Sequence, residues 1–513
     1  MRLWWHEGRL DSSLRWNDVE KAMDSFDLLV VGGGINGAAI ARDSAMRGAR
    51  VLLVEKDDLA AHTSSASSKL IHGGLRYLEY YRFRLVREAL AEREIMLRTA
   101  PHIVRPLQFV LPHCPALRPH WMIRSGLLLY DLFSIRGSLP RSRRVGRRRA
   151  DLNAPLKERR RVLSYWDAWV DDSRLTVLNA VAAAENGAEI ATRTELLSAR
   201  RDGDFWSAEL SGGRTVTAKA IVNAAGPWVA EVLGRRLAET SGSRVRLVKG
   251  SHILLPALWE GEQAYVLQQA DGRVVFALPF PGGFTLVGTT DIPVERPEDA
   301  TVSTDEIRYL CQAADRYFTR QVVPADVVWS YSGIRALWDD GAADPKAVTR
   351  DYHLELDPDP GAKLLSVFGG KITTARALAQ EALDQLGVEG RRSTSHAFLP
   401  GGDIYPDFLE WLEVVAGWMP RPLLARLSGA YGTRLRDLLG DSRSLAGLGR
   451  HFGAGLYERE LQWLRDREFA RTADDVLWRR TKLGLVMSEE EAAAVAEWFA
   501  TNPSPQRRLG PGG

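Results

Sequence analysis

Three glycines have a spacing that suits the binding of a pyrophosphate. Gly32, Gly34 and Gly37 form a G-x-G-x-x-G pattern between an apolar run at 26–31 and a predicted helix at 35–46. The first glycine permits a tight turn, the second lets phosphates approach the backbone, and the third lets the helix pack closely on the strand. The helix N-terminus then faces the negative charge of the phosphates. Strand, turn and helix together predict a dinucleotide site; a glycine-rich turn in an ordinary α/β domain is the alternative.

Two further segments are predicted to lie beside this turn. Glu55 follows a second apolar run at 50–54, where a carboxylate can accept hydrogen bonds from the ribose hydroxyls of adenosine. Ala225 and Gly226 lie in AIVNAAGPWV, an apolar run that is predicted to return next to the first strand. We therefore expect both segments to contact the dinucleotide.

A second stretch that could do chemistry begins after the second strand. Hydroxyl, basic and glycine residues follow one another in it, namely Ser64, Ser65, Ser67, Ser68, Lys69, His72, Gly73, Gly74 and Arg76. Small residues let a backbone lie close to a flat or phosphorylated ligand. We expect this stretch to reach the ligand, although many serine-rich loops bind nothing.

A third stretch repeats the order of strand, glycines and helix at 364–383. The pair Gly369 and Gly370 precedes Lys371, and a helix is predicted to begin near Thr373. Helix N-termini favour negative charge, and a lysine adds to that effect. The stretch could therefore support the negative charge of a reduced flavin.

The order of elements indicates which dinucleotide is bound. A helix with capping oxygens at 171–173, a strand at 189–192, a meander with turns at 202–203 and 212–213, and a returning strand follow the first unit. FAD-binding domains of the Rossmann type generally have this order, whereas NAD domains more often continue with regular βαβ units. We expect an α/β fold, with an FAD-binding Rossmann-type domain, an inserted antiparallel-sheet substrate domain and a C-terminal helical domain.

The chain is long enough for several domains, because one compact core rarely serves 513 residues. The predicted parts are an N-terminal extension (1–24), an FAD-binding domain in three pieces (25–104, 166–243 and 351–395), a basic and apolar cap segment (105–165), the antiparallel substrate domain (244–350) and the helical domain (396–513). Short β-type runs separated by turns at 244–350 suit a sheet that covers one face of a bound ring.

The cap segment combines apolar residues with dense positive charge. Its predicted helix, HWMIRSGLLLYDLF, precedes a run of arginines at 141–149. Such a combination is attracted to an anionic membrane surface, at about 1 kcal/mol for each basic side chain near the lipid. Nucleic acid attracts arginines too, but the run lacks the interleaved aromatic residues of a base-stacking surface. We therefore expect a peripheral membrane contact and no nucleic acid.

The remaining composition excludes several classes of protein. A net charge of +3 does not argue for a polyanionic partner, and two cysteines, Cys114 and Cys311, cannot form a disulfide framework. No group of residues has the spacing of a metal site, so no metal is expected. No apolar run approaches the roughly 20 residues of a spanning helix. The N-terminal extension contains Trp4, Trp5 and Trp16 without the continuous apolar run of a secretory signal, and we expect a surface arm.

Taken together, these segments closely resemble the FAD-dependent, quinone-linked sn-glycerol-3-phosphate dehydrogenases, a branch of the D-amino acid oxidase-like flavoproteins. The resemblance rests on VVGGGINGAAIARDSAMRG, SSASSKLIHGGLRYLE, FRLVREALAERE, WVDDSRL, VNAAGPWV, KGSHI, GTTD, YSGIRAL, TRDY, SVFGGKITTAR and ADDVLWRRTKLGL. It covers nearly everything from residue 26 onward. The N-terminal extension and the arginine run at 141–149 depart from it.

The resemblance implies oxidation of sn-glycerol 3-phosphate to dihydroxyacetone phosphate, with a hydride passing from C2 to N5 of FAD and electrons leaving for a membrane quinone. It implies catalytic roles for His72, His252, Arg335 and Lys371. The substrate contacts that it implies are Arg76, Tyr77, Arg335, Arg350 and Lys371. The expected contacts to FAD are Gly32, Gly34, Asn36, Gly37, Glu55, Ser64, Ser65, Ser68, Lys69, His72, Gly73, Gly74, Ala225, Gly226, Gly370, Lys371 and Thr373.

The physical chemistry of these residues fits those roles. A planar guanidinium pairs with a phosphate at two points, which a lysine cannot do. A base with a pKa near neutrality suits the removal of the hydroxyl proton, so either His72 or His252 could serve. Each choice has a plainer reading, because arginines also form surface ion pairs and a lone histidine is often structural. The family also implies a cytoplasmic protein at the inner face of the membrane, and we expect a homodimer.

Two alternatives stay open at this point. One is another enzyme of the same fold, either an oxidase of glycine, sarcosine or D-amino acids, or a glycerol-3-phosphate oxidase that uses oxygen. Several cationic residues favour a phosphate over the single carboxylate of an amine substrate. The other is a flavoprotein that binds RNA or lipid through residues 105–150 and oxidises no small molecule.

Overall fold

The first sheet is built around β1, an apolar strand buried on both faces. A computed structural model describes residues 24–113, 118–134, 137–158, 161–239, 245–339 and 351–504. The strands of this sheet are β1 (Asp24–Val31), β2 (Val51–Glu55), β7 (Glu189–Thr192), β8 (Leu196–Asp202), β9 (Phe205–Leu210), β10 (Arg214–Asn223), β17 (His353–Leu356) and β18 (Lys363–Phe368). Their order is β17-β18-β10-β1-β2-β7, with the β8–β9 hairpin attached to β10. Strands β18, β10, β1, β2 and β7 are parallel, so their carboxyl ends share one edge.

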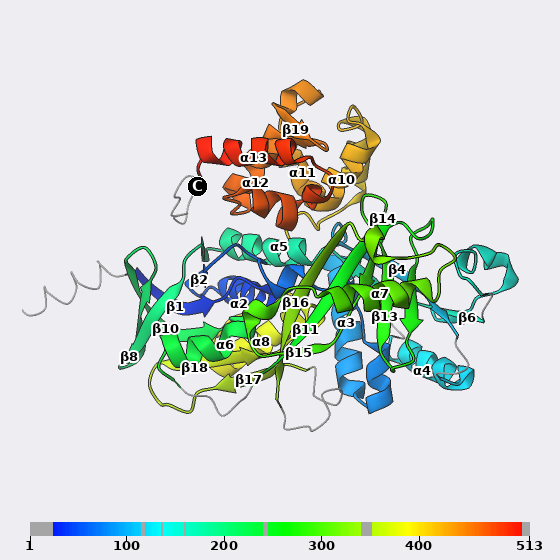
Figure 1. Ribbon diagram of the computed structural model, residues 1–513. Coiled ribbons are helices and arrows are strands. Elements are labelled where there is room, and N and C mark those ends of the chain that lie inside the picture. The colour runs from blue at the N-terminus through cyan, green and yellow to red at the C-terminus, as the bar shows by residue number, and fades with distance from the viewer. Residues whose placement is uncertain are drawn as a thin grey trace, which may run out of the picture.

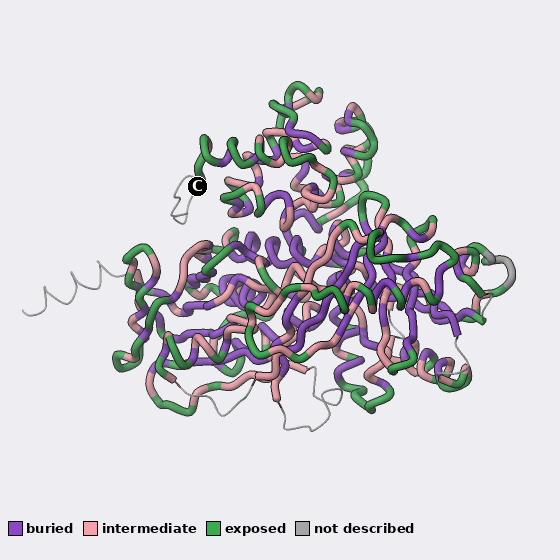
Figure 2. The backbone as a smooth tube through the Cα atoms, viewed as in Figure 1, coloured by how far each residue is buried: buried purple, intermediate pink, exposed green. Residues whose placement is uncertain are grey.

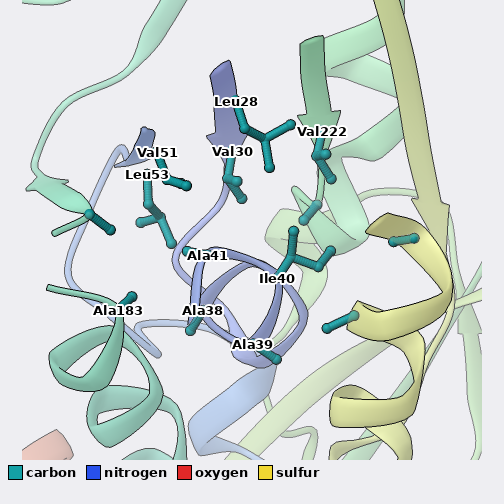
Figure 3. Packing of buried hydrophobic residues seen from close by; sticks show 14 of the residues in the cluster. Leu28, Val30, Ala38, Ala39, Ile40, Ala41, Val51, Leu53, Ala183 and Val222 are labelled. Carbon is teal, nitrogen blue, oxygen red and sulfur yellow. The ribbon is translucent and has the colours of Figure 1, made fainter. Parts of the chain in front are cut away.

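Three helices cover one face of this sheet. They are α2 (Ile35–Met46), α5 (Asp172–Glu185) and α8 (Ala375–Leu386), and α2 lies between the other two (Figure 3). Helix α2 presents Ala38, Ala39, Ile40 and Ala41 to the core, and these small side chains bring the helix close to β1 and β2. This packing fixes the N-terminus of α2 at the carboxyl edge of the sheet.

The second sheet has ten strands and is mostly antiparallel. They are β3 (Leu70–Ile71), β4 (Val104–Pro112), β5 (Arg143–Arg144), β6 (Val162–Val170), β11 (Val245–Pro256), β12 (Ala264–Gln268), β13 (Val274–Phe280), β14 (Phe284–Gly288), β15 (Ile292–Val294) and β16 (Trp329–Trp338). The main path is β15-β11-β14-β13-β12-β4-β6-β3, with β16 paired to β11 and β5 to β6. Strands β4 and β6 from the cap segment thus belong to the same sheet as the strands at 245–338.

Helices α3 (Phe83–Thr99), α4 (His120–Phe133), α6 (Val229–Glu231) and α7 (Thr304–Asp315) complete the body. Helix α4 lies at the lower right of Figure 1, on the side of the body away from the C-terminal domain. Its buried residues are Ile123, Leu127 and Tyr130. No helix in the described residues is both long and apolar enough to cross a bilayer.

A helical domain with its own apolar core forms the C-terminal part. Its elements are α9 (Pro406–Val414), α10 (Arg421–Tyr431), α11 (Leu435–Leu439), β19 (His451–Gly453), β20 (Leu456–Tyr457), α12 (Glu458–Arg467) and α13 (Glu489–Thr501). It lies over α5, at the top of Figure 1. Buried segments run through both sheets and through α5 beneath this domain (Figure 2).

Most of the predicted elements are confirmed by the structure. The helix at 35–46 and the strand at 189–192 have the expected bounds, and Asp171 caps α5 by accepting a hydrogen bond from Arg174 N at 3.2 Å. The helix expected near Thr373 begins at Ala375, after a short helical turn at Ile372–Thr374. The N-terminal extension, Cys114 and Arg350 lie outside the described residues.

Candidate active site

A cavity of about 720 Å³ is lined by residues from the carboxyl edge of the first sheet and from the second sheet. Its wall includes Gly32, Glu55, Arg335 and Lys371. It continues beneath α4, where Met122 contributes to the wall. The cavity therefore joins the glycine turn, the serine loop and the stretch after β18, which are far apart in the sequence.

The glycine turn has the geometry that a phosphate cradle needs. Gly32 has a φ of +114°, and a Cβ there would lie 2.6 Å from the carbonyl oxygen of Ala224. A Cβ on Gly37 would lie 1.9 Å from the carbonyl oxygen of Gly32. Both positions therefore require glycine, one for the turn and the other for helix packing. Gly34 lines the cavity, whereas Gly37 supports the turn from behind.

Glu55 is buried at the end of β2. Its carboxylate accepts hydrogen bonds from Gly33 N at 2.7 Å and Asp57 N at 2.8 Å. Burial raises the pKa of Glu55, although these two hydrogen bonds oppose the shift. Ala225 lies beside the turn, where a Cβ on Gly32 would lie 3.1 Å from its Cα, and Ala225 and Gly226 both line the cavity.

The serine loop divides into residues that face the cavity and residues that support it. Ser64 and Ser68 line the cavity, and Ser64 Oγ accepts a hydrogen bond from Ile35 N at 2.9 Å in the first turn of α2. Ser65 is not among the residues that line this cavity. The hydroxyl of Ser64 thus ties the loop to the phosphate end.

Lys69, which the sequence analysis expected to contact the cofactor, is not among the residues that line the cavity. Its side chain is buried, and Nζ lies 2.8 Å from Asp172 Oδ1, away from the cavity wall. Ser67 Oγ also donates to Asp172, at 2.7 Å. Burial alone would raise the pKa of Asp172, but Lys69 lowers it, so the carboxylate stays charged. Asp172, expected only as a helix cap, instead anchors the serine loop.

The two candidate histidines occupy different environments. His72 lines the cavity. His252 is buried behind the wall, where its ring stacks on Tyr331 at 4.9 Å and its Nε2 lies 2.9 Å from Ser68 Oγ. Burial, followed by the charge of Arg335, lowers the pKa of His252 to about 3. His252 is therefore neutral and positions Ser68 rather than facing the cavity.

Four of the five expected substrate residues line the cavity, namely Arg76, Tyr77, Arg335 and Lys371. Lys371 Nζ lies 4.0 Å from the centre of the Tyr77 ring. Arg335 Nη1 lies 2.6 Å from Asp291 Oδ1, and its Nη2 lies 3.4 Å from Thr289 Oγ1. The guanidinium is therefore held in place by GTTD, a stretch to which the sequence analysis gave no role.

Several glycines and the Asn36 amide also belong to the cavity wall. Gly74 and Gly370 have φ values of +73° and +96°, and both line the cavity, as does Thr373. Asn36 Nδ2 donates to Gly369 O at 3.1 Å. Gly73 is not in the wall; a Cβ there would lie 2.7 Å from Tyr130 Oη and 2.7 Å from Leu90 Cδ2. The glycine at 73 thus allows close packing against α3 and α4, and the expected cofactor contact at this position stays a prediction.

The residues present fit a bound FAD. One cavity contains both the glycine cradle and several cations in its wall. Two buried polar atoms in that wall, Asn36 Oδ1 and Arg76 Nε, have no hydrogen-bond partner in the part of the chain that the structure describes. Buried polar groups rarely remain unsatisfied, so these atoms point to ligands.

Comparisons with known proteins agree with this geometry. Residues 27–384 match the family model described as FAD dependent oxidoreductase, and residues 392–502 match the C-terminal domain of alpha-glycerophosphate oxidase. A glycerol-3-phosphate dehydrogenase of Bacillus halodurans, solved in complex with FAD, has a TM-score of 0.70 and 26% identity, covering 95% of this chain and 93% of that one.

Curated relatives are more similar in sequence. A D-erythritol 1-phosphate dehydrogenase of Brucella abortus is 50% identical, over 93% of this chain and 98% of that protein. A glycerol-3-phosphate dehydrogenase of Pseudomonas aeruginosa is also 50% identical, over 92% and 95%. The aerobic glycerol-3-phosphate dehydrogenase of Escherichia coli is 45% identical, over 93% and 98%.

Proposed function

This chain belongs to the FAD-dependent oxidoreductases, with FAD as its cofactor, and we propose that it oxidises sn-glycerol 3-phosphate to dihydroxyacetone phosphate. The observation that carries the proposal is that the cations Arg76, Arg335 and Lys371 line the same cavity as the glycine turn. A phosphate dianion next to a flavin requires such cations. A single carboxylate, as in an amino acid, would need fewer.

FAD is held by residues along the length of the cavity. The glycine turn and the N-terminus of α2 receive the pyrophosphate, and Glu55 lies at the adenosine end. Ser64, Asn36 and Gly370 also line the cavity. When bound, FAD supplies the acceptor for the hydride that leaves C2 of the substrate.

The cationic end binds and orients the substrate. Arg76 and Arg335 donate to the phosphate and to the oxygen on C2, and Lys371 adds positive charge where that oxygen loses its proton. Asp291 holds the Arg335 guanidinium at 2.6 Å, which limits its movement when substrate enters. Tyr77 covers Lys371 and helps to exclude water.

His72 is the proposed base for the C2 hydroxyl. It lines the cavity, whereas His252 is buried and its Nε2 is already paired with Ser68. A pKa of about 3 also makes His252 a weak base. His72 accepts the hydroxyl proton in this scheme, and His252 supports the loop.

Membrane quinone is the proposed electron acceptor, reached from an anionic membrane surface on the cytoplasmic side. Helix α4 supports this choice, because Trp121 and Leu132 on its outer face are 70% and 61% exposed. Arg143 and Arg144 are also exposed, and Arg124 of α4 lies 3.3 Å from Ser142 Oγ, which places the arginine run beside the helix. Apolar residues next to arginines suit a peripheral membrane contact. We also propose a homodimer, as the sequence resemblance implies.

A second candidate substrate is D-erythritol 1-phosphate. The Brucella abortus relative that carries this name is as similar to the chain as a glycerol-3-phosphate dehydrogenase is. Both substrates are polyol phosphates, so the same cations would serve either one.

The test uses the oxidised holoprotein without oxygen. Addition of sn-glycerol 3-phosphate should bleach the flavin absorbance, and an unchanged spectrum would contradict the proposal. D-Erythritol 1-phosphate is tested in parallel, and the faster reduction identifies the preferred substrate. Reoxidation by a soluble quinone analogue supports a dehydrogenase, whereas rapid formation of peroxide in air favours an oxidase.

A further inference from the structure

The short segment 72–77 carries three of the residues proposed to act on the substrate. They are His72, Arg76 and Tyr77, and all three line the cavity. The backbone bends between them at Gly74, which has a φ of +73°. The positions of a base and of two binding groups therefore depend on how this bend is held.

A hydrogen bond to helix α4 holds the bend from outside the cavity. Gly73 is buried, and its N–H donates to Tyr130 Oη at 2.8 Å. Tyr130 lies on the inner face of α4 and is only 2% exposed, so water does not compete for its hydroxyl. The phenol is thus the polar partner that α4 offers to the bend.

The tyrosine is itself fixed by two charged residues. Its hydroxyl donates to Asp167 of β6, at 2.8 Å from both carboxylate oxygens. Arg93 Nη1 of α3 donates to Asp167 Oδ1 at 2.7 Å, and both charged side chains are 2% exposed. A buried, paired carboxylate of this kind fixes the orientation of the phenol, and the Gly73 amide also acts on that carboxylate. We call Tyr130, Asp167 and Arg93 the cavity triad.

Steric packing prevents the bend from sliding along the tyrosine. A Cβ on Gly73 would lie 2.7 Å from both Tyr130 Oη and Leu90 Cδ2. Side chains of α3 and α4 therefore pack closely against Gly73 while the Tyr130 hydroxyl binds its amide. This packing leaves no room for a side chain at position 73.

We propose that Tyr130 is a positioning residue for the reaction, and that its hydroxyl holds His72, Arg76 and Tyr77 in their working positions through the amide of Gly73. The proposal rests on the proposed function, because it assigns the purpose of the segment to substrate oxidation. Tyr130 does not touch the substrate in this scheme. It acts through the backbone between the base and the phosphate ligands.

The C-terminal domain offers a matched control. Tyr431 Oη donates to Glu460 Oε1 at 2.8 Å, and Arg426 Nη1 donates to the same oxygen at 2.7 Å. Tyr431 is 1% exposed and lies in the core of its own domain, outside the cavity wall. We call Tyr431, Glu460 and Arg426 the domain triad. Tyr431→Phe removes the same kind of hydrogen bond without touching the segment at 72–77.

The experiment measures anaerobic reduction of FAD by sn-glycerol 3-phosphate in purified holoprotein. Wild type must be reduced first; a failure there contradicts the proposed function and not this inference. Tyr130→Phe should then lower the rate constant for reduction at least about tenfold, and raise the substrate concentration for half-maximal rate, since displacement of His72 and Arg76 affects both. Its FAD content should stay that of wild type, because the glycine cradle is untouched. Tyr431→Phe should lower the melting temperature and leave both kinetic values unchanged.

The inference is overturned if Tyr130→Phe reduces FAD as fast as Tyr431→Phe does at every substrate concentration. A second variant, Gly73→Ala, reaches the same contact while Tyr130 stays in place. It should also slow reduction at least about tenfold, because the methyl group displaces the segment. In the double variant the two losses should not multiply, since both act through one contact, and fully multiplied losses would likewise overturn the inference.

Discussion

The cavity triad and the domain triad have nearly the same hydrogen-bond distances, but they contact different parts of the molecule. In each, a phenol donates at 2.8 Å and an arginine donates at 2.7 Å to the same buried carboxylate oxygen. The phenol oxygen of the cavity triad also accepts a hydrogen bond from the N–H of Gly73. The ring of Tyr431 instead faces the guanidinium of Arg174, at 5.0 Å. The hydrogen bonds within the two triads are therefore similar. The further contact that each tyrosine makes is what differs, and we infer from it that the cavity triad serves catalysis and the domain triad serves stability.

The domain triad lies within the C-terminal domain, and other buried ionic contacts join that domain to the body. Arg174 of α5 forms a buried ion pair with Glu468, and Arg480 Nη1 lies 2.6 Å from Asp58 Oδ2, soon after β2. These pairs are buried, so removing one partner leaves a charge without compensation. They attach the C-terminal domain to the body, whereas the cavity triad contacts one segment of the active site.

The largest difference between the two regions is expected when one arginine is removed from the cavity and one from the C-terminal domain. Arg335→Ala should lower kcat/KM by about 100-fold or more, because the substrate loses a charged donor at the reacting end of the cavity. Its KM should rise and its kcat should fall. Arg426→Ala should instead lower the free energy of unfolding by about 3 kcal/mol, because Glu460 stays buried without its partner.

Steady-state kinetics and denaturant titration of the two variants separate these effects. Arg335 is about one-third exposed, so its loss should change stability little. Unchanged kinetics in Arg335→Ala would remove this residue from the phosphate and alkoxide roles. A large kinetic loss in Arg426→Ala would show that the C-terminal domain acts on the cavity directly, and the contrast between the regions would fail.

The glycine motif shows how much of the site could be predicted from the sequence. Gly32 and Gly37 stand where the pattern predicts a tight turn and close helix packing, because the pattern follows from local backbone geometry, which a few consecutive residues determine. Helix α2 has its expected bounds for the same reason. The FAD-binding fold and the helical C-terminal domain, confirmed by the family matches, follow from the order of such local units.

Side-chain direction within the serine loop could not be predicted in this way. Lys69 was expected to contact FAD, but it turns to Asp172, which is 103 positions further along the chain. Gly73 has the right residue type for a ligand contact, yet Tyr130 and Leu90 are what approach it. Such pairings depend on how α3, α4 and α5 pack around the loop, and no local pattern records that arrangement. The signal that the sequence offered for this pairing was an acid directly after a helix cap, as at Asp172.

Acid should weaken the two regions in different pH ranges. The folded protein holds His252 at a pKa of about 3, whereas an unfolded histidine has a pKa near 6.5. The unfolded state therefore binds one more proton between these values. Stability from His252 is complete above about pH 6.5 and is lost progressively as the pH falls towards 3. At pH 5 the loss should be about 2 kcal/mol.

His252→Gln should flatten this part of the stability curve, because glutamine keeps a polar contact for Ser68 and does not titrate. Asp475 of the C-terminal domain provides the comparison. Burial alone would raise its pKa, but hydrogen bonds from Arg193 and the backbone of Arg471 bring it to about 2. Asp475→Asn should therefore change the pH dependence only between about pH 4 and pH 2. Denaturant titrations at pH 7, 5 and 3.5 measure both; equal slopes in wild type and His252→Gln from pH 7 to 5 would contradict the assignment.

The smallest contrast concerns two exposed apolar helices with opposite surroundings. On α4, Trp121 and Leu132 lie near exposed arginines, whereas on α9, Leu409 and Val414 are 54% and 75% exposed next to acidic side chains. The exposed acids of α9 are Asp407, Glu410 and Glu413. An anionic bilayer attracts the first combination and repels the second, since each basic side chain near the lipid contributes about 1 kcal/mol.

Trp121→Ser should therefore weaken binding to vesicles of phosphatidylglycerol and phosphatidylcholine by a few fold, because an indole ring no longer enters the interface. Leu409→Ser, the matched change on α9, should leave vesicle binding at the wild-type level. Co-sedimentation with vesicles at two salt concentrations measures both variants, and salt should weaken binding of wild type because the arginines are screened. Equal losses in the two variants would mean that α4 is not the membrane side. The quinone would then have to approach the cavity from elsewhere, and the exposed face of α4 would need another partner.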